Sequence, residues 1–219
     1  KVFAVVFRDD YDQGGAHPNT AIITFNYLMP DGWRVYLGEI IRPDGFARVS
    51  DLAIADLDRR LGLTPPDDES VRSGAGPYSF NFTEFTLLND EIVLRFDPYA
   101  VASHADGPQE AHLAFRNLSG VVRSDWRAPQ PSFDCAKAVS TVERALCGDV
   151  ALARLDREVS EEYLHRIKVD ADAAYIERTT VEQRDWLARR DRDCAHAADM
   201  KACLTASYRA RLKVLAPGL

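Results

Sequence analysis

All four cysteines of this chain lie within its last 85 residues, at Cys135, Cys147, Cys194 and Cys203. The spacings of 12 and 9 residues contain no CxxC pair, so they are unlike the close ligand pairs of a zinc site. Disulfides persist mainly outside the reducing cytosol, and cross-linked cysteines are typical of small exported units. Of the three possible pairings, we favour Cys135–Cys147 and Cys194–Cys203, because each would tie a helix end to its flanking loop. The cysteines thus predict a separate, stapled unit in an exported, periplasmic or cell-surface protein.

The segment around the cysteines has helical periodicity throughout. Ser140 and Glu143 fit a capping box for a short helix that ends at Cys147-Gly148, and Asp149 suits the cap of the next helix. Apolar residues then recur every three or four positions. They are Leu152, Leu155, Val159, Tyr163 and Ile167, then Tyr175, Ile176, Trp186 and Leu187, then Leu204, Tyr208, Leu212 and Leu215. We expect a small helical bundle or long helical hairpin whose thin core needs the disulfides.

The residues before the cysteines have an α+β pattern. Pro129 and Pro131 indicate an extended linker at 127–131, which predicts one domain at 1–127 and a second at 132–219. Runs rich in β-branched and aromatic residues predict an antiparallel sheet from strands at 2–8, 20–28, 33–41, 80–88, 91–96 and 111–116. Ser50 is a plausible cap for one short helix at 51–61, and 64–76 is expected to be a polar loop.

The net charge of −7 lies entirely in the first part of the chain. Residues 1–131 hold 12 basic and 19 acidic residues, whereas 132–219 hold 15 of each. This excess argues against nucleic acid as a partner and favours a basic partner, although solubility alone also explains it.

No apolar run is long enough to cross a membrane. The chain starts within a strand-like pattern, so we expect that an export signal, or a lipid or membrane anchor, precedes Lys1.

Candidate binding residues lie in two loops of the first part. Gly14-Gly15-Ala16-His17-Pro18-Asn19 separates two strands, and His17 and Asn19 either stabilise a structural hairpin loop or project into a partner's cleft. The long loop from 97 to 108 carries Tyr99, His104 and Asp106. Long loops on a sheet often carry function, but Asp97 and Tyr99 would equally serve to brace this one.

No catalytic, metal or cofactor site is expected. His17, Asp97, His104 and His112 lack the HxH and HExxH spacings of zinc sites. Ser103 and Ser119 have no GxSxG frame.

In the helical part, Trp186 and Arg190 share a helix face. We favour a packed tryptophan with an Arg190–Asp ion pair that sets helix register. The alternative is that Arg189, Arg190 and Arg192 contact a partner or an anionic envelope polymer.

The helical part contains a series of short motifs across 133–215 that includes all four cysteines. They are Phe133-Asp134-Cys135-Ala136-Lys137-Ala138, Val142-Glu143-Arg144-Ala145-Leu146-Cys147, Leu152-Ala153-Arg154-Leu155-Asp156, Gln183-Arg184-Asp185-Trp186-Leu187, Arg190-Asp191-Arg192-Asp193-Cys194, Cys203-Leu204 and Tyr208-Arg209-Ala210-Arg211-Leu212. Through these motifs the helical part resembles the LprI-type lysozyme-inhibitor domain family.

The first part, over about 1–118, resembles the extracellular domain of RsiV-type anti-sigma factors, which sense lysozyme, and of some peptidoglycan deacetylases. The motifs are the loop from Gly14 to Asn19, Leu37-Gly38-Glu39-Ile40, Phe96-Asp97-Pro98-Tyr99-Ala100-Val101-Ala102 and Gly107-Pro108-Gln109-Glu110.

Both resemblances imply a non-catalytic bacterial envelope protein that binds lysozyme or a related muramidase and occludes its substrate cleft. His17, Asn19, Tyr99, His104 and Asp106 are the predicted contact residues. The alternative is an accessory module that binds peptidoglycan. The class of lysozyme, the contacting module, the anchor and the oligomeric state stay open.

Overall fold

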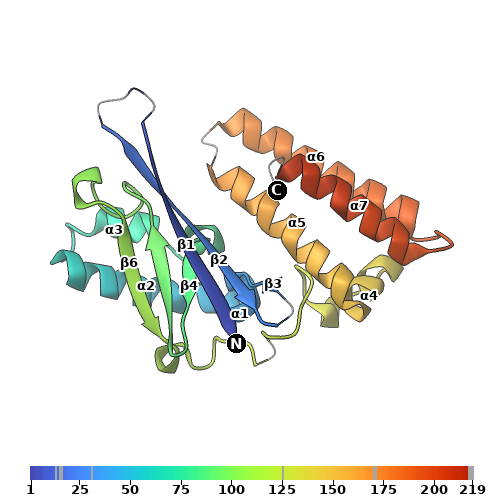
Figure 1. Cartoon of the computed structure of the whole chain (residues 1–219), viewed down its shortest axis with the longest axis horizontal. Coiled ribbons are helices and arrows are strands. Elements are labelled where there is room, and N and C mark those ends of the chain that lie inside the picture. The colour runs from blue at the N-terminus through green and yellow to red at the C-terminus, as the bar shows by residue number, and fades with distance from the viewer. Residues whose placement is uncertain (13, 15–16, 31, 125, 170–171, 217–219) are drawn as a thin grey trace. The chain divides into compact units, whose positions relative to one another are not determined.

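The computed structural model describes the chain except for residues 13, 15–16, 31, 125, 170–171 and 217–219, and except for the side chains of 168 and 169. It divides into two compact units, Lys1–Arg127 and Ala128–Leu219. Strands occur in the first unit, and the second is built from helices, as Figure 1 shows. The α+β fold class followed by a stapled helical region is therefore confirmed.

The first unit contains two antiparallel sheets of three strands each, in the orders β1-β2-β3 and β4-β5-β6. The strands are β1 (Val2–Tyr11), β2 (Asn19–Leu28), β3 (Trp33–Arg34), β4 (Phe85–Leu87), β5 (Glu91–Phe96) and β6 (Gln109–Ala114). β1 and β2 form a hairpin with ten consecutive residue pairs, from Val2 opposite Leu28 to Tyr11 opposite Asn19. An unbroken ladder of this length makes the hairpin a single straight arm.

Side chains of β2 join the two sheets. Thr24 accepts a hydrogen bond from the Phe85 amide at 2.9 Å, and the Thr24 amide itself donates to Glu84 at 2.6 Å. Asn26 donates to the Phe85 carbonyl and accepts from the Leu87 amide, both at 2.8 Å. Thr24 and Asn26 are buried, so these bonds satisfy polar groups that would otherwise be costly. They also set the position of the hairpin on the second sheet.

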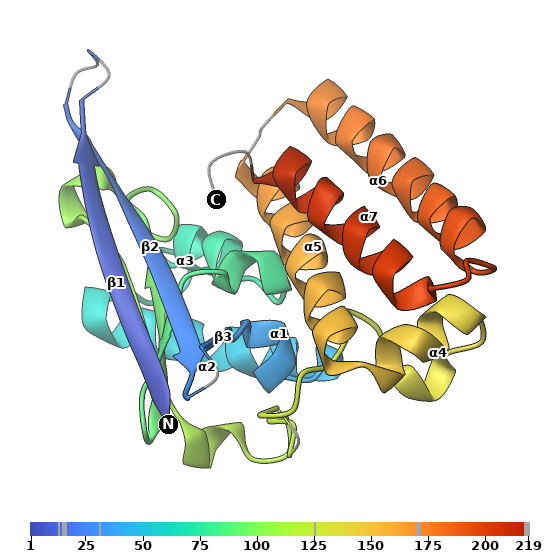
Figure 2. The same ribbon diagram turned by 45° about the vertical axis from the view of Figure 1, so that its right-hand side comes forward.

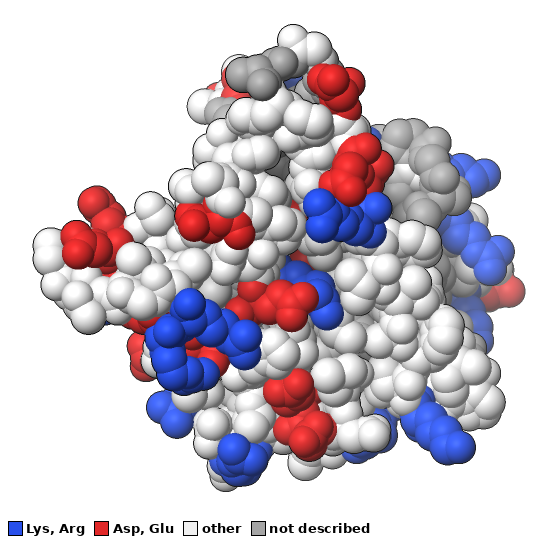
Figure 3. Space-filling model, turned by 60° about the vertical axis from the view of Figure 1, so that its left-hand side comes forward, with Lys and Arg blue, Asp and Glu red and all other residues white. Residues whose placement is uncertain are grey.

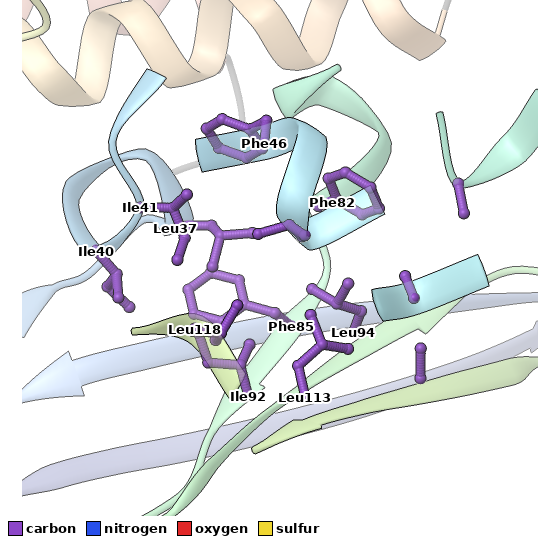
Figure 4. Close-up of a cluster of buried hydrophobic side chains, with 14 of the residues drawn as sticks. Leu37, Ile40, Ile41, Phe46, Phe82, Phe85, Ile92, Leu94, Leu113 and Leu118 are labelled. Atoms are coloured by element: carbon purple, nitrogen blue, oxygen red, sulfur yellow. The ribbon is translucent and has the colours of Figure 1, made fainter. Parts of the chain in front are cut away.

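The helices and 3₁₀ turns of the first unit cover the second sheet. They are α1 (Leu37–Ile40), α2 (Phe46–Leu61) and α3 (Glu69–Gly74), with 3₁₀ turns at Pro43–Gly45, Ser79–Phe82, His104–Asp106 and Phe115–Leu118. Side chains from α1, β5 and β6 gather in one hydrophobic core, which Figure 4 shows around Leu37, Ile40, Ile92, Leu94 and Leu113. All five are at most 5% exposed.

The predicted strand at 33–41 is wrong over most of its length. Only Trp33–Arg34 pairs with β2, and the chain then turns into α1. The helical turn places Leu37 and Ile40 together in the core, and the Glu39 side chain accepts from the Tyr36 amide at 2.9 Å. Burial at a spacing of three residues therefore outweighed the β propensity of the segment.

The predicted helix at 51–61 begins earlier, at Phe46, directly after the turn that starts with Pro43. Proline at this place has the fixed φ that a helical turn requires. Ser50 is therefore not a cap. It is buried and donates to the Ala75 carbonyl at 2.6 Å, which ties α2 to the end of α3.

Other boundaries in the first unit also differ. The expected loop at 64–76 contains α3, which buries Val71 and carries an Asp68–Arg72 ion pair across one turn. The strand expected at 80–88 is confined to β4, because the preceding residues form a 3₁₀ turn that buries Phe82. The strand expected at 111–116 is β6, which starts and ends two residues earlier.

The second unit consists of four α-helices and a 3₁₀ turn in its described residues. They are a 3₁₀ turn at Cys135–Lys137, α4 (Thr141–Gly148), α5 (Val150–Val169), α6 (Ala173–Cys194) and α7 (Met200–Leu215). The capping box of Ser140 and Glu143 is confirmed, and Asp149 accepts from the amides of Ala151 and Leu152 at the start of α5.

Both predicted disulfides are present. Cys135–Cys147 links the 3₁₀ turn at Cys135–Lys137 to α4, and Cys194–Cys203 links the end of α6 to α7. The core between the helices is small, and Leu152, Trp186 and Leu204 lie in it. Leu187 was expected in the buried stripe of its helix, but it is 37% exposed.

Among the described residues, no helix has the length and apolar character that a membrane span requires.

Candidate functional site

Three of the five predicted contact residues meet in one aromatic cluster of the first unit. His17 comes from the loop between β1 and β2, whereas Tyr99 and His104 come from the loop between β5 and β6. The rings of His17 and His104 stack with centroids 3.7 Å apart, and the Tyr99 ring lies 5.2 Å from that of His104. We refer to His17, Tyr99 and His104 as the histidine cluster. Gly15 and Ala16 of the predicted loop lie outside the described residues.

Hydrogen bonds connect the three rings. The Pro18 carbonyl lies 3.1 Å from His17 Nδ1 and 3.1 Å from His104 Nε2, and a ring nitrogen that carries a proton can donate to it. His17 Nε2 lies 3.1 Å from the Tyr99 hydroxyl, and the tautomer of His17 decides which of the two donates. The three side chains therefore form a connected network that holds the rings in place.

Tyr99 has an unusual backbone. Its φ of 71° lies in the left-handed region, which costs a residue with a bulky side chain free energy. The side chain is 63% exposed, so core packing does not explain this conformation. Such strain is common at binding sites, where the backbone holds a side chain in a fixed outward direction.

Two acidic residues stabilise the same loop. Asp97 accepts from the Ile22 amide of β2 at 2.7 Å, and this bond anchors the loop to the hairpin. Asp106 accepts from the hydroxyl and the amide of Ser103 at 2.6 and 3.1 Å and so closes a 3₁₀ turn. Asp106 therefore has a local structural role. Asn19, the fifth predicted residue, opens β2 opposite Tyr11.

The structure does not bring together the four residues that were weighed as a metal site. His112 lies on β6, where its ring nitrogens are 3.2 Å from Glu91 and 3.4 Å from Glu110. Within the part of the chain that the structure describes, no group of three or more His, Cys, Asp or Glu side chains has a geometry suited to a metal ion.

Acidic side chains do not gather in one patch on the face shown in Figure 3. They are interspersed there with Lys and Arg. On this face the negative excess of the first unit forms no single patch, so it would act on a basic partner here as a diffuse attraction.

In the helical unit, a buried polar network lies between three helices. The Tyr208 hydroxyl of α7 donates to Asp156 of α5 at 2.6 Å and accepts from Arg190 of α6, whose guanidinium lies 3.6 Å from the same carboxylate. Burial, together with the charge of Asp156, raises the pKa of Tyr208 well above its usual value. Arg190 also contacts Asp191 of the same helix at 2.7 Å. The Arg190–Asp156 contact links α6 to α5, so it is this pair that the predicted role in helix register would require.

Sequence reasoning missed the role of Asp156. Its carboxylate also accepts from the Ser132 amide at 2.6 Å, and the neighbouring Arg157 donates to the Pro131 carbonyl at 2.5 Å. Asp156 and Arg157 thus hold the residues that lead into the helical unit. The sequence signal for this role was the charged pair Asp156-Arg157, which directly follows Leu155 of the predicted apolar stripe. Charged residues within such a stripe are rarely buried unless they are paired.

Comparison with protein families gives two matches in order along the chain. Residues 38–116 match DUF3298, which is described as a protein of unknown function. Residues 134–215 match the family described as Lysozyme inhibitor LprI, and this confirms the resemblance of the helical part. The more specific resemblance of the first unit to RsiV-type sensors stays a prediction.

Among curated proteins, the peptidoglycan-N-acetylmuramic acid deacetylase PdaC of Bacillus subtilis is 28% identical over 125 residues. The match covers 56% of this chain and 27% of that protein, so the chain spans about a quarter of the relative's length. Two crystal structures of DUF3298 family members are also similar. The one from Bacteroides fragilis has 20% identity, a TM-score of 0.44 and coverage of 56% of this chain and 48% of that chain. The one from Pseudomonas aeruginosa has 18% identity, a TM-score of 0.44 and coverage of 57% of each chain.

Proposed function

We propose that this chain is an exported, non-catalytic protein of the bacterial cell envelope that binds lysozyme and inhibits it by occluding the substrate cleft. The observation that carries the proposal is the match of residues 134–215 to Lysozyme inhibitor LprI. The two disulfides of the same unit support export, since such cross-links are typical of oxidising compartments. Periplasmic or surface location, with a lipid or membrane anchor, is part of the proposal.

We place the contact with lysozyme at the histidine cluster, flanked by Asn19 and Asp106. A glycosidase cleft holds two carboxyl groups, at least one of them ionised, that an inhibitor must satisfy when it excludes water. An imidazole N–H or the phenol O–H of the cluster would exchange its present partner, the Pro18 carbonyl or His17, for such a carboxylate and form a charge-assisted hydrogen bond with it. The strained backbone at Tyr99 and the Asp97–Ile22 bond support this placement, because a preorganised loop loses less entropy on binding.

The first experiment mixes the purified chain with c-, g- and i-type lysozymes and measures both binding and muramidase activity. We expect at least one class to bind and to lose activity in proportion to the fraction bound. If no class binds and activity is unchanged at micromolar concentrations of the chain, the proposal is wrong. Affinity is expected to fall with added salt, because the first part of the chain carries the whole net charge of −7.

A second experiment tests the contact site. Tyr99→Ala and the double change His17→Ala with His104→Ala should each weaken lysozyme binding by about tenfold or more, as expected for central aromatic contacts. His112→Ala is the matched control, because this histidine lies elsewhere in the same unit, beside Glu91. Equal losses in the control and the test variants would place the contact outside the histidine cluster.

A glycan-binding accessory module is the second candidate, and the similarity to PdaC favours it. Sedimentation with purified peptidoglycan, in the absence of lysozyme, separates the two functions. Retention on peptidoglycan without any effect on muramidase activity would favour the accessory module. Release of acetate from peptidoglycan would instead show that the chain is catalytic.

A further inference from the structure

The outer edge of β1 is a long row of unpaired backbone groups. β1 lies at the end of the sheet order β1-β2-β3, and Figure 2 shows it beside β2. The Met29 amide donates to the Lys1 carbonyl at 2.8 Å, so odd-numbered residues of β1 bond to β2. Because the direction alternates along a strand, even-numbered residues from Val2 to Asp10 point their N–H and C=O groups outward.

This edge lacks the features that normally keep an edge strand from pairing. Proteins protect such edges with proline, bulges, short length or charge. β1 runs for ten residues without proline, its ladder with β2 is continuous, and residues 2–7 carry no charge. Among the described residues, no strand covers the outer edge.

The solvent-facing side of the same hairpin is aromatic. Phe3 and Phe7 of β1 are 56% and 54% exposed. Phe7 packs edge-to-face on Phe25 of β2 with centroids 5.9 Å apart, and Phe25 lies 6.3 Å from Tyr27. Large exposed aromatic groups beside an unpaired edge mark an interaction surface.

We propose that a second copy of this chain pairs with this edge, with the two β1 strands antiparallel about a two-fold axis at Val5. Both β1 strands direct the N–H and C=O groups of their even-numbered residues toward the shared edge. Even-numbered residues must therefore lie opposite even-numbered residues, and odd-numbered opposite odd-numbered. The register centred on Val5 places Phe3 opposite Phe7 of the partner. It also places Lys1 opposite Asp9 of the partner, and the symmetry makes each of these pairs twice.

Charge complementarity selects this register over its neighbours. A centre at Ala4 places Lys1 opposite Phe7, a centre at Val6 places Phe3 opposite Asp9, and a centre at Phe7 places Lys1 beyond the end of the partner's β1. In the Val5 register the aromatic and charged pairs are the close, non-hydrogen-bonded ones, in which cross-strand side chains interact most strongly. The result is one continuous six-stranded sheet with three strands from each copy. The paired segment ends before Tyr11.

Backbone pairing from Val2 to Arg8 uses none of the residues of the histidine cluster. The dimer would therefore present two copies of the proposed lysozyme contact. Dimerisation itself does not depend on the proposed function and is tested without lysozyme.

The experiment measures the mass of the full chain by sedimentation and light scattering from about 1 to 500 µM. A single strand pair gives a small interface, so we expect a dissociation constant of about 10–100 µM. Val6→Pro should abolish dimerisation, because Val6 directs its N–H outward and proline is tolerated at such a position of an edge strand. A chain that stays monomeric over the whole range overturns the proposal, as does a dimer that survives Val6→Pro with its fold intact.

A charge swap tests the register even if Val6→Pro disturbs folding. Asp9→Lys alone and Lys1→Asp alone should each weaken the dimer by about tenfold, because each creates two like-charge pairs. The double variant should restore the original affinity. Asp51→Lys is the control. It makes an equal change of charge at an exposed position of α2 and should have little effect.

Failure of the double variant to restore the dimer would overturn the Val5 register. Hydrogen exchange gives a direct readout, since the amides of Ala4, Val6 and Arg8 should become protected as the concentration of the chain rises. Protection of these amides only after lysozyme is added would assign the edge to lysozyme and not to a second copy.

Discussion

The two units of this chain are stabilised by different means. Among the described residues, the core of the first unit contains 21 buried hydrophobic residues within Lys1–Arg127, and that of the second contains nine within Ala128–Leu219. Both disulfides and the buried network of Asp156, Tyr208 and Arg190 lie in the unit with the smaller core. Where helices bury too little apolar surface, covalent links and specific polar contacts supply what the core does not.

The difference implies different vulnerabilities. The first unit should be sensitive to changes of volume or backbone in its core, and the second to loss of a cross-link or of one member of the polar network. The stability of each unit can be followed separately by hydrogen exchange with mass spectrometry, because the two units occupy separate stretches of the sequence.

The largest effect is expected for Asp156→Ala. This change leaves the buried Arg190 in contact with the half-exposed Asp191, and it also removes the acceptor of Tyr208. Removing one member of a buried ion pair typically costs about 3–5 kcal/mol. Denaturant unfolding should show the loss in the second unit alone. Asp191→Ala is the comparison, and it should cost less than Asp156→Ala, because Asp191 is half-exposed and Arg190 keeps its contact with Asp156.

Removing either disulfide should destabilise the second unit by about 3 kcal/mol, because each closes a short loop whose entropy returns on reduction. The variants are Cys135→Ala with Cys147→Ala, and Cys194→Ala with Cys203→Ala. Calorimetry with and without reductant measures the change. An equal loss in the first unit, which holds no disulfide, would show that the two units unfold together and that the contrast between them is wrong.

A counterpart in the first unit is Gly74→Ala. A Cβ at this position would lie 1.7 Å from the Ala100 carbonyl oxygen, so the backbone at the end of α3 must move. Overpacking of this kind costs about 1–3 kcal/mol. The loss should appear only in the first unit. Gly148→Ala is the control, since its Cβ would meet no atom within 4 Å.

Acid should weaken the second unit through Asp149. Its hydrogen bond to the Lys201 side chain, and then that to the Leu152 amide, lower the pKa of this carboxyl. A lowered folded-state pKa gives stability that is present above the unfolded pKa of about 3.9 and is lost as pH falls through the folded value. Asp149→Asn keeps a cap but does not titrate, so its unfolding free energy should depend less on pH below about 4.

Alkali provides the smallest test. Burial, and then the charge of Asp156, raise the pKa of Tyr208, so its contribution is complete below the unfolded value near 10 and decreases above it. Tyr208→Phe should remove this decrease in the second unit. A wild-type unit whose stability is constant to pH 11 would contradict a buried, neutral Tyr208.

The helical unit was more predictable than the α+β unit. Its caps at Ser140 and Asp149 and its disulfides depend on contacts between residues at most 12 positions apart, which spacing alone reveals. In the first unit, the segments at 33–41 and 80–88 have β propensity, yet burial of Leu37, Ile40 and Phe82 imposes helical turns there. Propensity is local, but burial is decided by the whole core.

The same division between local and long-range contacts applies to the candidate site. The sequence by itself determined which residue types occupy two loops and the periodicity of the helices, and it favoured the pairing of the cysteines that the structure shows. Only the tertiary structure decided that His17 stacks on His104 and meets Tyr99, 82 positions away, and that Asp156, Tyr208 and Arg190 share one buried network. Contacts between distant segments depend on how strands and helices pack in three dimensions, and that packing leaves no fixed spacing in the chain.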